Sequence, residues 1–186
     1  MKIYLVRHGQ TDWNNEKRFQ GHRDIPMNAA GIGQMEELAG RIAEKGISFD
    51  RIISSPLERA RKSAEIISEK TGYTGTIVID EDFIERDCGI LEGTVWTPGL
   101  DFDDEKYGFE SIPELLNRAK RALCKYSFSD DDNVLIVSHG AILAATRTVL
   151  SDGRIDYFDQ SVPVIQGNVL CCEIQDGKET VFRNLF

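Results

Sequence analysis

The sequence of 186 residues predicts an α/β fold in three layers, with helices on both faces of a mostly parallel central sheet. Short apolar runs alternate with helical patterns along the chain, which is typical of parallel strands joined by helices. The run at 134–137 is apolar without a break, as expected for a strand that is buried on both faces. Because neither a repeat nor a linker interrupts this pattern, we expect a single domain over residues 1–186.

The N-terminal half gives the clearest alternation of strands and helices. Asn28 is placed to cap a helix, and Gly46 is placed to end it. Pro56 is typical of the first position of the next helix. The elements expected here are a strand at 3–6, a polar loop at 10–27, a helix at 28–45, a strand at 51–55 and a helix at 56–72.

The C-terminal half begins with a short strand and an irregular stretch. Residues 80–110 are rich in glycine and acidic side chains, and we expect a partial lid at 94–110. Ser111 and Glu114 then have the S-x-x-E form of a capping box. The elements expected are a strand at 76–79, a helix beginning at 111, a strand at 134–137, a helix at 141–150, and a hairpin of strands at 169–174 and 180–183 around Asp176-Gly177.

Composition limits the classes of function. A net charge of −9 argues against a nucleic-acid or anionic-membrane surface, which needs clustered Lys and Arg. No apolar run approaches the roughly 18 residues that span a bilayer, and no signal-type segment follows Met1. We therefore expect a soluble cytoplasmic protein. A small anionic substrate remains compatible with the charge if a few arginines gather in one cleft.

Several phosphatase chemistries are disfavoured by the sequence. None of the four cysteines begins a C-x5-R loop or a C-x-x-C pair, so we expect them to be packing residues. Asp101 and Asp103 follow no buried strand, which disfavours an aspartyl-phosphate enzyme. The three histidines are dispersed without the spacing of metal ligands. We expect a site that uses neither a metal nor a cofactor.

Two predicted strands end in similar ways, with Arg7-His8-Gly9 and with Ser138-His139-Gly140. Ligands of parallel sheets bind beyond the carboxyl ends of the strands, so both imidazoles are expected in one crevice. Arg59, in the first turn of a helix after another strand, is expected to join them. Helix N-termini attract anions through their free amides and dipole. Together these groups predict a phosphate pocket.

These motifs together resemble the histidine phosphatase superfamily, in its phosphoglycerate mutase-like branch. The resemblance extends over nearly the whole chain. It rests on Leu5-Val6-Arg7-His8-Gly9-Gln10-Thr11 with Asn14, Gln20-Gly21 with Asp24-Ile25-Pro26, Ser54-Ser55-Pro56-Leu57 with Arg59-Ala60, Glu85 with Gly89 and Glu92-Gly93, and Val137-Ser138-His139-Gly140. It implies a phosphoglycerate mutase-like fold.

The resemblance also implies roles for individual residues. His8 would be the nucleophile that becomes phosphohistidine, and Glu85 would donate a proton to the leaving group. The phosphoryl oxygens would be held by Arg7, Arg59 and His139. Imidazole has a pKa near about 6.5, so an unprotonated nitrogen is available to attack phosphorus at neutral pH. Arginine forks match phosphate geometry and stabilise the charge that spreads over its oxygens.

Some assignments stay open at this point. Glu92 is an alternative to Glu85 as the acid, and Asn14 is either a pocket residue or a turn residue. His22 is expected at the rim of the site. Substrate contacts are further expected from Gln20, Gly21 and Gly140.

The reaction class also has alternatives. Mutases of the family are typically longer after the Glu-Gly pair and carry basic residues there, whereas Lys106 is the one cation between Thr94 and Asn117. We therefore expect a metal-independent phosphomonoester hydrolase acting on a small phosphorylated metabolite, with an uncharged or aromatic leaving group. The alternatives are a cofactor-dependent phosphoglycerate mutase and a phosphate-binding regulatory module without turnover.

Overall fold

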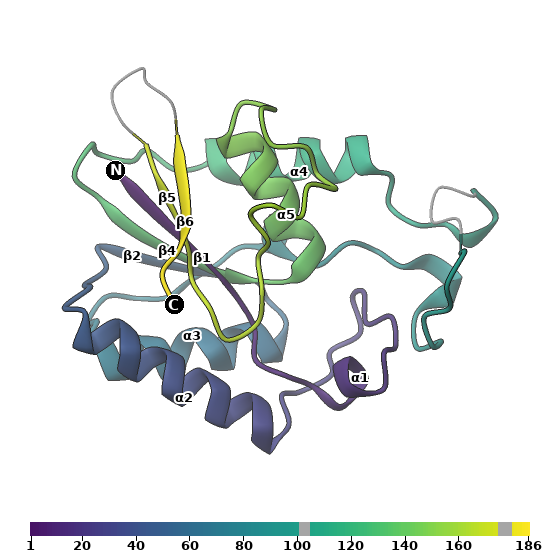
Figure 1. Cartoon of the computed structure of the whole chain (residues 1–186), viewed down its shortest axis with the longest axis horizontal. Coiled ribbons are helices and arrows are strands. Elements are labelled where there is room, and N and C mark those ends of the chain that lie inside the picture. Colours follow the sequence, from purple (N-terminus) through teal and green to yellow (C-terminus); the bar gives the residue numbers. More distant parts are fainter. Residues whose placement is uncertain (101–104, 175–179) are drawn as a thin grey trace.

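The computed structural model describes residues 1–100, 105–174 and 180–186 and has the three layers that the sequence predicts (Figure 1). Helices α2 and α3 cover one face of the central sheet, and α4 and α5 cover the other. The helices are α1 (Asp12–Asn15), α2 (Ala29–Glu44), α3 (Glu58–Thr71), α4 (Ile112–Cys124) and α5 (Gly140–Leu150). The strands are β1 (Lys2–Arg7), β2 (Arg51–Ser54), β3 (Val78–Ile79), β4 (Asn133–Ser138), β5 (Leu170–Glu173) and β6 (Val181–Asn184).

The strand order β3-β2-β4-β1-β5-β6 makes the sheet mostly parallel. Strands β3, β2, β4 and β1 run in one direction and pair in parallel, whereas β5 runs opposite to them and pairs antiparallel with both β1 and the edge strand β6. Arg7 is level with Ser138 across β1 and β4, and Ser54 is level with Val137 across β2 and β4. The carboxyl ends of the three central strands therefore meet at one edge of the sheet.

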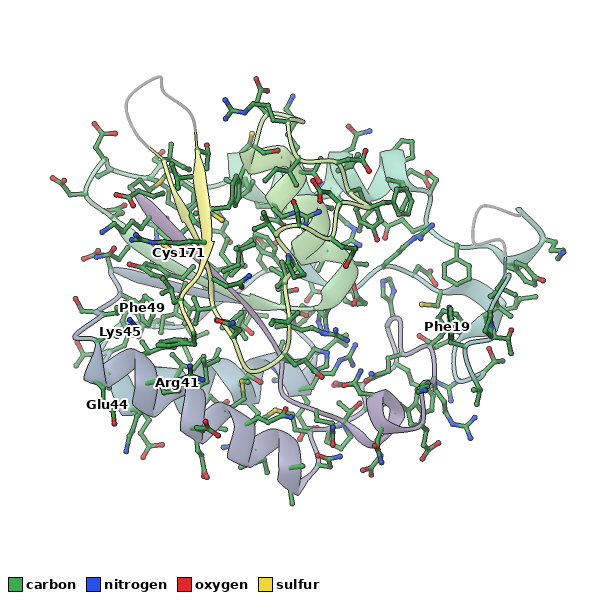
Figure 2. All side chains as sticks on the ribbon, viewed as in Figure 1. Phe19, Arg41, Glu44, Lys45, Phe49 and Cys171 are labelled. Atoms are coloured by element: carbon green, nitrogen blue, oxygen red, sulfur yellow. The ribbon has the colours of Figure 1, made fainter. Side chains whose placement is uncertain are left out.

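The core lies on both faces of the sheet because alternate residues of each strand point to opposite sides. Ile3 and Leu5 pack on the side of α4 and α5, whereas Tyr4 and Val6 pack on the side of α2 and α3. Cys171 and Cys172 divide in the same way, so their prediction as packing residues on opposite faces is confirmed. Figure 2 shows Phe49 and Cys171 near the C-terminal end of α2, with Phe19 at the far end of the molecule.

Most of the predicted elements are confirmed, with small shifts at their ends. Asn28 caps α2 through a 2.9 Å hydrogen bond from the amide of Gly31, and Ser111 forms the predicted capping box with Glu114. The helix expected from Pro56 begins two residues later, at Glu58, because Leu57 is extended and serves as its N-cap. The strand expected at 76–79 is reduced to two residues, β3.

The two segments expected to be irregular contain short turns of helix. Thr11 caps the one-turn helix α1 inside the predicted loop 10–27. Residues 80–110 hold the short 3₁₀ turns η1 (Glu81–Phe83), η2 (Gly89–Leu91) and η3 (Glu105–Tyr107). The predicted lid at 94–110 falls partly outside the described residues, and the predicted Asp176-Gly177 turn lies wholly outside them.

A close backbone contact fastens the loop after β1 to the start of α2. A Cβ atom added at Gly31 would overlap the backbone of Gln10, and one added at Gly9 would overlap the carbonyl of Gly31. The amide of Asn28 also donates to the Gln10 carbonyl at 3.0 Å. Glycine is needed at both positions because any side chain would push the loop that follows His8 away from α2.

This contact predicts opposite effects for two Gly→Ala changes in the same helix. Gly31→Ala should lower the free energy of unfolding in urea by about 1–3 kcal/mol, because the added methyl has no room. Gly33→Ala is the matched control, because a Cβ there meets nothing within 4 Å. It should raise the free energy of unfolding by about 0.5–1 kcal/mol through helix propensity. Equal effects of the two changes would show that the contact does not constrain the loop.

Candidate functional site

The ends of β1, β4 and β2 bring the predicted site residues together. His8 follows β1, His139 follows β4 and Ser55 follows β2. The His8 amide donates to the Ser138 carbonyl at 2.9 Å, which continues the β1–β4 pairing one residue further. The two imidazole centroids lie 5.1 Å apart. The two imidazoles are therefore adjacent, but only His8 is among the described residues that line the cavity, because His139 is fully buried behind it.

His8 is held in one tautomer and in its neutral form. Its side chain is buried, and Nδ1 lies 2.7 Å from the Gly9 carbonyl oxygen. Because a carbonyl only accepts, Nδ1 carries the hydrogen and donates it, which leaves the lone pair on Nε2. Burial, followed by the nearby Arg59 and Arg7 guanidiniums, lowers the pKa of His8 well below its ordinary value. Nε2 is thus unprotonated at neutral pH, and its lone pair is available to attack an electrophile.

His139 is fully buried and bonds to the protein through both ring nitrogens. Arg59 Nε donates to His139 Nδ1 at 3.2 Å. The hydrogen of His139 therefore resides on Nε2, which donates to Ser55 Oγ at 2.7 Å. Burial and the Arg59 charge lower the pKa of His139 as well. In this arrangement His139 orients Arg59, instead of pointing a free nitrogen at a ligand.

Two guanidiniums flank the His8 ring, one from the fully buried Arg59 and one from the partly buried Arg7. Arg59 has no exposed surface, and its terminal nitrogens donate to the carbonyls of Arg23 at 2.8 Å and Gly21 at 3.0 Å. Arg7 Nε is buried, without a hydrogen-bond partner among the described residues. Burial lowers the pKa of both arginines, but guanidinium starts so high that both stay charged at neutral pH. These two positive charges attract an anion strongly at this site, although the protein as a whole has a net charge of −9.

Glu85 reaches the site from the segment after η1. Its Oε1 accepts from the amides of Arg86 at 2.9 Å and of Ala141 and Ile142, both at 3.1 Å. The carboxylate is thereby fixed in orientation at the cavity wall. The exposed His22 donates from Nε2 to the Glu85 carbonyl at 2.8 Å, which agrees with a place at the rim.

Glu92 lies differently from Glu85. It accepts from the Arg23 amide at 2.8 Å and pairs with the Arg23 guanidinium at 3.5 Å. These bonds fasten the loop that carries Gly21 to the segment after η2. Glu92 is not among the described residues that line the cavity, whereas Glu85 is.

The helix N-termini, which we expect to attract an anion, bind carboxylates of the chain itself. The first amides of α5 donate to Glu85. The amide of Glu58, the first residue of α3, donates to Asp24 Oδ1 at 2.7 Å. Carboxylates of the chain itself occupy these anion-binding positions, as the dipole favours. The sequence did not reveal this, since both carboxylates come from distant segments.

Asn14 is oriented by a hydrogen-bond network. Its Oδ1 accepts from the Thr11 amide at 3.1 Å and from Gln166 Nε2 at 3.1 Å. Gln166 Nε2 also donates to the His8 carbonyl at 3.0 Å. With Oδ1 engaged, the donor end of the Asn14 amide is left for the cavity that this residue lines. Gln20 lines the cavity too and accepts from Thr11 Oγ1 at 2.9 Å.

The two predicted glycine contacts have different outcomes. Gly21 lines the cavity with a φ of 51°, and its carbonyl binds Arg59. Gly140 lies against Arg7, because a Cβ added there would be 3.5 Å from Arg7 Cζ. Gly140 is absent from the described residues that line the cavity, so it packs against Arg7 without facing the cavity itself.

These residues surround a cavity of about 370 Å³ with a charged floor and an apolar mouth. Phe19 and Phe109 make an edge-to-face pair at 5.7 Å, and Tyr157 and Phe158 make another at 4.9 Å. The sequence reasoning missed these aromatic residues, because they come from loops without any periodic pattern. The lining is formed by Arg7, His8, Asn14, Arg18, Phe19, Gln20, Gly21, Arg59, Glu85, Arg86, Cys88, Phe109, Ala141, Tyr157 and Phe158.

A wider groove of about 620 Å³ lies beside the cavity and shares Phe109 with it. Its charged side chains satisfy one another or nearby residues: Arg118 pairs with Glu110 at 2.6 Å, and Arg121 pairs with Asp82 at 2.6 Å. The groove holds neither His8 nor His139. Of these two cavities, only the smaller one is lined by predicted catalytic residues.

Other reactive groups near the cavity are inert or absent. Burial raises the pKa of Cys88 to about 12, so its thiol stays protonated and is a poor nucleophile at neutral pH. Over the described ranges, no three His, Cys, Asp or Glu side chains are grouped so that they could hold a metal ion.

The described helices include none that is long and apolar enough to cross a membrane.

The family model of the histidine phosphatase superfamily (branch 1) matches residues 3–183. The chain belongs to this superfamily. A Bacillus subtilis relative, "Uncharacterized phosphatase PhoE", is 39% identical over 155 residues, which cover 81% of this chain and 78% of that protein. The Escherichia coli "Probable phosphoglycerate mutase GpmB" is 36% identical over 159 residues, 77% of this chain and 71% of that protein.

The fold of the superfamily is equally clear from solved structures. A mycobacterial glucosyl-3-phosphoglycerate phosphatase in complex with VO3 superposes with a TM-score of 0.82 at 23% identity, over 98% of this chain and 96% of that one. The expected phosphoglycerate mutase-like fold is confirmed. The chain is a phosphatase of the histidine phosphatase superfamily, and a phosphohistidine mechanism is typical of that family.

Proposed function

We propose that the chain hydrolyses small phosphomonoesters with an uncharged or aromatic leaving group, through a phosphoryl group carried on His8 Nε2. The observation that carries this proposal is that His8 is buried and neutral. Its Nδ1–H donates to the Gly9 carbonyl, and its ring lies close to the guanidiniums of Arg7 and Arg59. The apolar mouth of the same cavity supports the choice of leaving group, since aromatic rings pack well against Phe109 and Phe158.

The proposed reaction has two steps. His8 Nε2 attacks phosphorus, and the bond to the leaving oxygen breaks as Glu85, entering this step with its carboxyl group protonated, gives that oxygen a proton. Water then attacks the phosphohistidine, Glu85 takes up a proton, and orthophosphate leaves with His8 restored. Arg7, Arg59 and the amide of Asn14 hold the phosphoryl oxygens, where fixed donors stabilise the spreading charge. Each remaining N–H of the Arg59 fork can donate while Gly21 and Arg23 stay bound.

His139 is proposed to act through Arg59 in the resting enzyme. Its Nδ1 accepts from Arg59 Nε, and Ser55 fixes its tautomer. A direct bond from His139 to a phosphoryl oxygen would require one of these two contacts to break. The neutral state of both imidazoles also spares the site two further positive charges beside the arginines.

A mutase is the second candidate function, and it is favoured by the 36% identity to the GpmB protein. Both reactions share the first step and differ in whether water or substrate takes the phosphoryl group. Lys106, the cation expected to matter here, has an exposed side chain over the Tyr107 ring at 4.6 Å. Neither residue lines the cavity described above, which supports hydrolysis.

A cytoplasmic location is also a proposal. All four cysteines are free, including the exposed Cys124. Free thiols persist in reducing compartments, which supports this location.

Phosphate release in the presence of EDTA tests the proposed reaction. Suitable substrates are p-nitrophenyl phosphate, phosphoserine, and 3-phosphoglycerate with 2,3-bisphosphoglycerate. We expect release from the aryl ester to survive EDTA and to fall by about 10³-fold or more in His8→Ala. Isomerisation of 3-phosphoglycerate without net release would establish the mutase instead. Phosphate binding without turnover of any ester would point to a regulatory module.

The choice between Glu85 and Glu92 can be settled by isosteric variants. Glu85→Gln keeps an oxygen for the amides of Ala141 and Ile142 but removes the transferable proton. It should slow release from an alkyl phosphate by about 10²–10⁴-fold, because an alkoxide needs protonation. The kcat/KM for p-nitrophenyl phosphate, which depends only on the steps up to phosphohistidine formation, should fall far less, since p-nitrophenolate leaves without a proton.

Glu92→Gln is the matched control and should change neither rate by more than about twofold, since Glu92 binds Arg23 away from the cavity. Alkyl-selective loss in Glu92→Gln, with Glu85→Gln unaffected, would reverse the assignment.

A further inference from the structure

The loop at 151–168 builds one wall of the cavity without any helix or strand of its own. It leaves the end of α5, passes the cavity with Tyr157 and Phe158, and reaches Gln166 beside His8. Loops of this length without regular structure need specific contacts to hold one conformation. The contacts that hold this loop therefore decide the shape of the wall.

The buried side chain of Arg147 binds the backbone of the first half of this loop. Arg147 lies in the last turn of α5 and is 1% exposed. Its Nη1 donates to the carbonyls of Asp159 at 2.9 Å and Val162 at 2.7 Å. Its Nη2 donates to the carbonyls of Asp156 at 2.8 Å and Tyr157 at 3.1 Å. Four bonds from one rigid planar group thus fix the backbone from 156 to 162.

Helix α5 connects this wall to Glu85, because its two ends bind one each. The first turn of α5 binds Glu85 through the amides of Ala141 and Ile142, and its last turn binds the loop through Arg147. A cation at the C-terminal turn is also favoured by the helix dipole. Because α5 is one rigid element, Glu85 and the wall are set at a fixed separation.

The loop presents its aromatic pair to the cavity next to these bonds. Arg147 binds the carbonyl of Tyr157 itself, and Phe158 stands edge-to-face on the Tyr157 ring at 4.9 Å. Phe158 is 65% exposed, so the chain alone does not cover its ring. A bound aromatic leaving group would cover it and gain contact area.

Arg147 does not line the catalytic cavity, so any effect on substrate passes through the loop. We propose that Arg147 is a positioning residue that sets the affinity for the leaving group by holding the Tyr157–Phe158 wall in place. The phosphoryl site at His8, Arg7 and Arg59 does not depend on it. This inference rests on the proposed hydrolase function.

The test compares two quantities that the wall affects differently. One is the KM for 1-naphthyl phosphate, whose rings reach the wall; the other is the Ki of inorganic phosphate, which occupies only the charged floor. Arg147→Lys keeps the buried positive charge but loses the planar guanidinium group whose two terminal nitrogens bind the loop carbonyls. We expect its KM to rise by about fivefold to tenfold, the scale of one lost aromatic contact, with kcat and Ki changed by less than about twofold.

Two further variants sharpen the test. Arg154→Lys is the matched control, because Arg154 belongs to the same loop and donates from Nε to the Ser151 carbonyl at 2.9 Å, away from residues 156–162. It should leave KM and Ki unchanged. Phe158→Ala should raise KM as Arg147→Lys does, and the fold should tolerate this change because the Phe158 side chain is exposed. The double variant with Arg147→Lys should add little to either single change.

Each outcome decides the matter. An unchanged KM in Arg147→Lys, or KM and Ki rising together, would overturn the inference, because the second result describes a general disturbance of the site. If Arg147→Lys fails to fold, Phe158→Ala decides: an unchanged KM there overturns the inference, and a selective rise supports it. Absence of phosphate release from wild type, with orthophosphate still bound, would instead refute the proposed function.

Discussion

The site depends on the parallel pairing of β1 with β4. This pairing sets Arg7 level with Ser138 and is extended by the bond from the His8 amide to the Ser138 carbonyl. One residue of slippage would turn every side chain of β1 to the opposite face. The register therefore fixes both the core contacts of β1 and the approach of His8 to His139. Catalytic geometry and stability share one constraint.

Burial determines the charge state of the site. Two imidazoles and two guanidiniums lie within one cluster, and four positive charges there would repel strongly. The imidazoles relieve this repulsion by remaining neutral, with the pKa values of both His8 and His139 lowered. Arg7 and Arg59 keep the positive charge that attracts a phosphate ester. The same low polarity that keeps His8 neutral thus leaves it suited to the proposed nucleophilic role, while the two arginines keep the pocket cationic.

Much of this site could be predicted from the sequence, because its signals are local. The apolar run before Arg7-His8 and the run before His139 specify buried strands, and the chain order places both tips at one edge. The caps at Asn28 and Ser111 also depend on neighbouring residues alone. Short-range patterns of this kind carry their own physical cause, whether a hydrophobic period or a capped amide.

The parts that sequence reasoning missed arise from contacts between distant segments. Glu85 binds the start of α5 across 56 residues, so its carboxylate occupies those amides. Gln166 reaches His8 across 158 residues, and no pattern in its own loop marks it. Arg147 looks like an ordinary helix residue in the sequence, yet it is buried and binds four carbonyls. Such contacts depend on the tertiary fold and leave no local signature.

The state of His8 in the resting enzyme is the most direct measurement of this account. Nitrogen-15 NMR of the histidine rings, with His8 and His139 assigned through single substitutions, reports which nitrogen carries hydrogen at each pH. The account predicts that His8 keeps its hydrogen on Nδ1 and stays neutral as the pH falls through about 6.5, because its pKa is lowered by burial and by the adjacent arginines. Protonation of His8 near its ordinary pKa, or a hydrogen on Nε2, would contradict it.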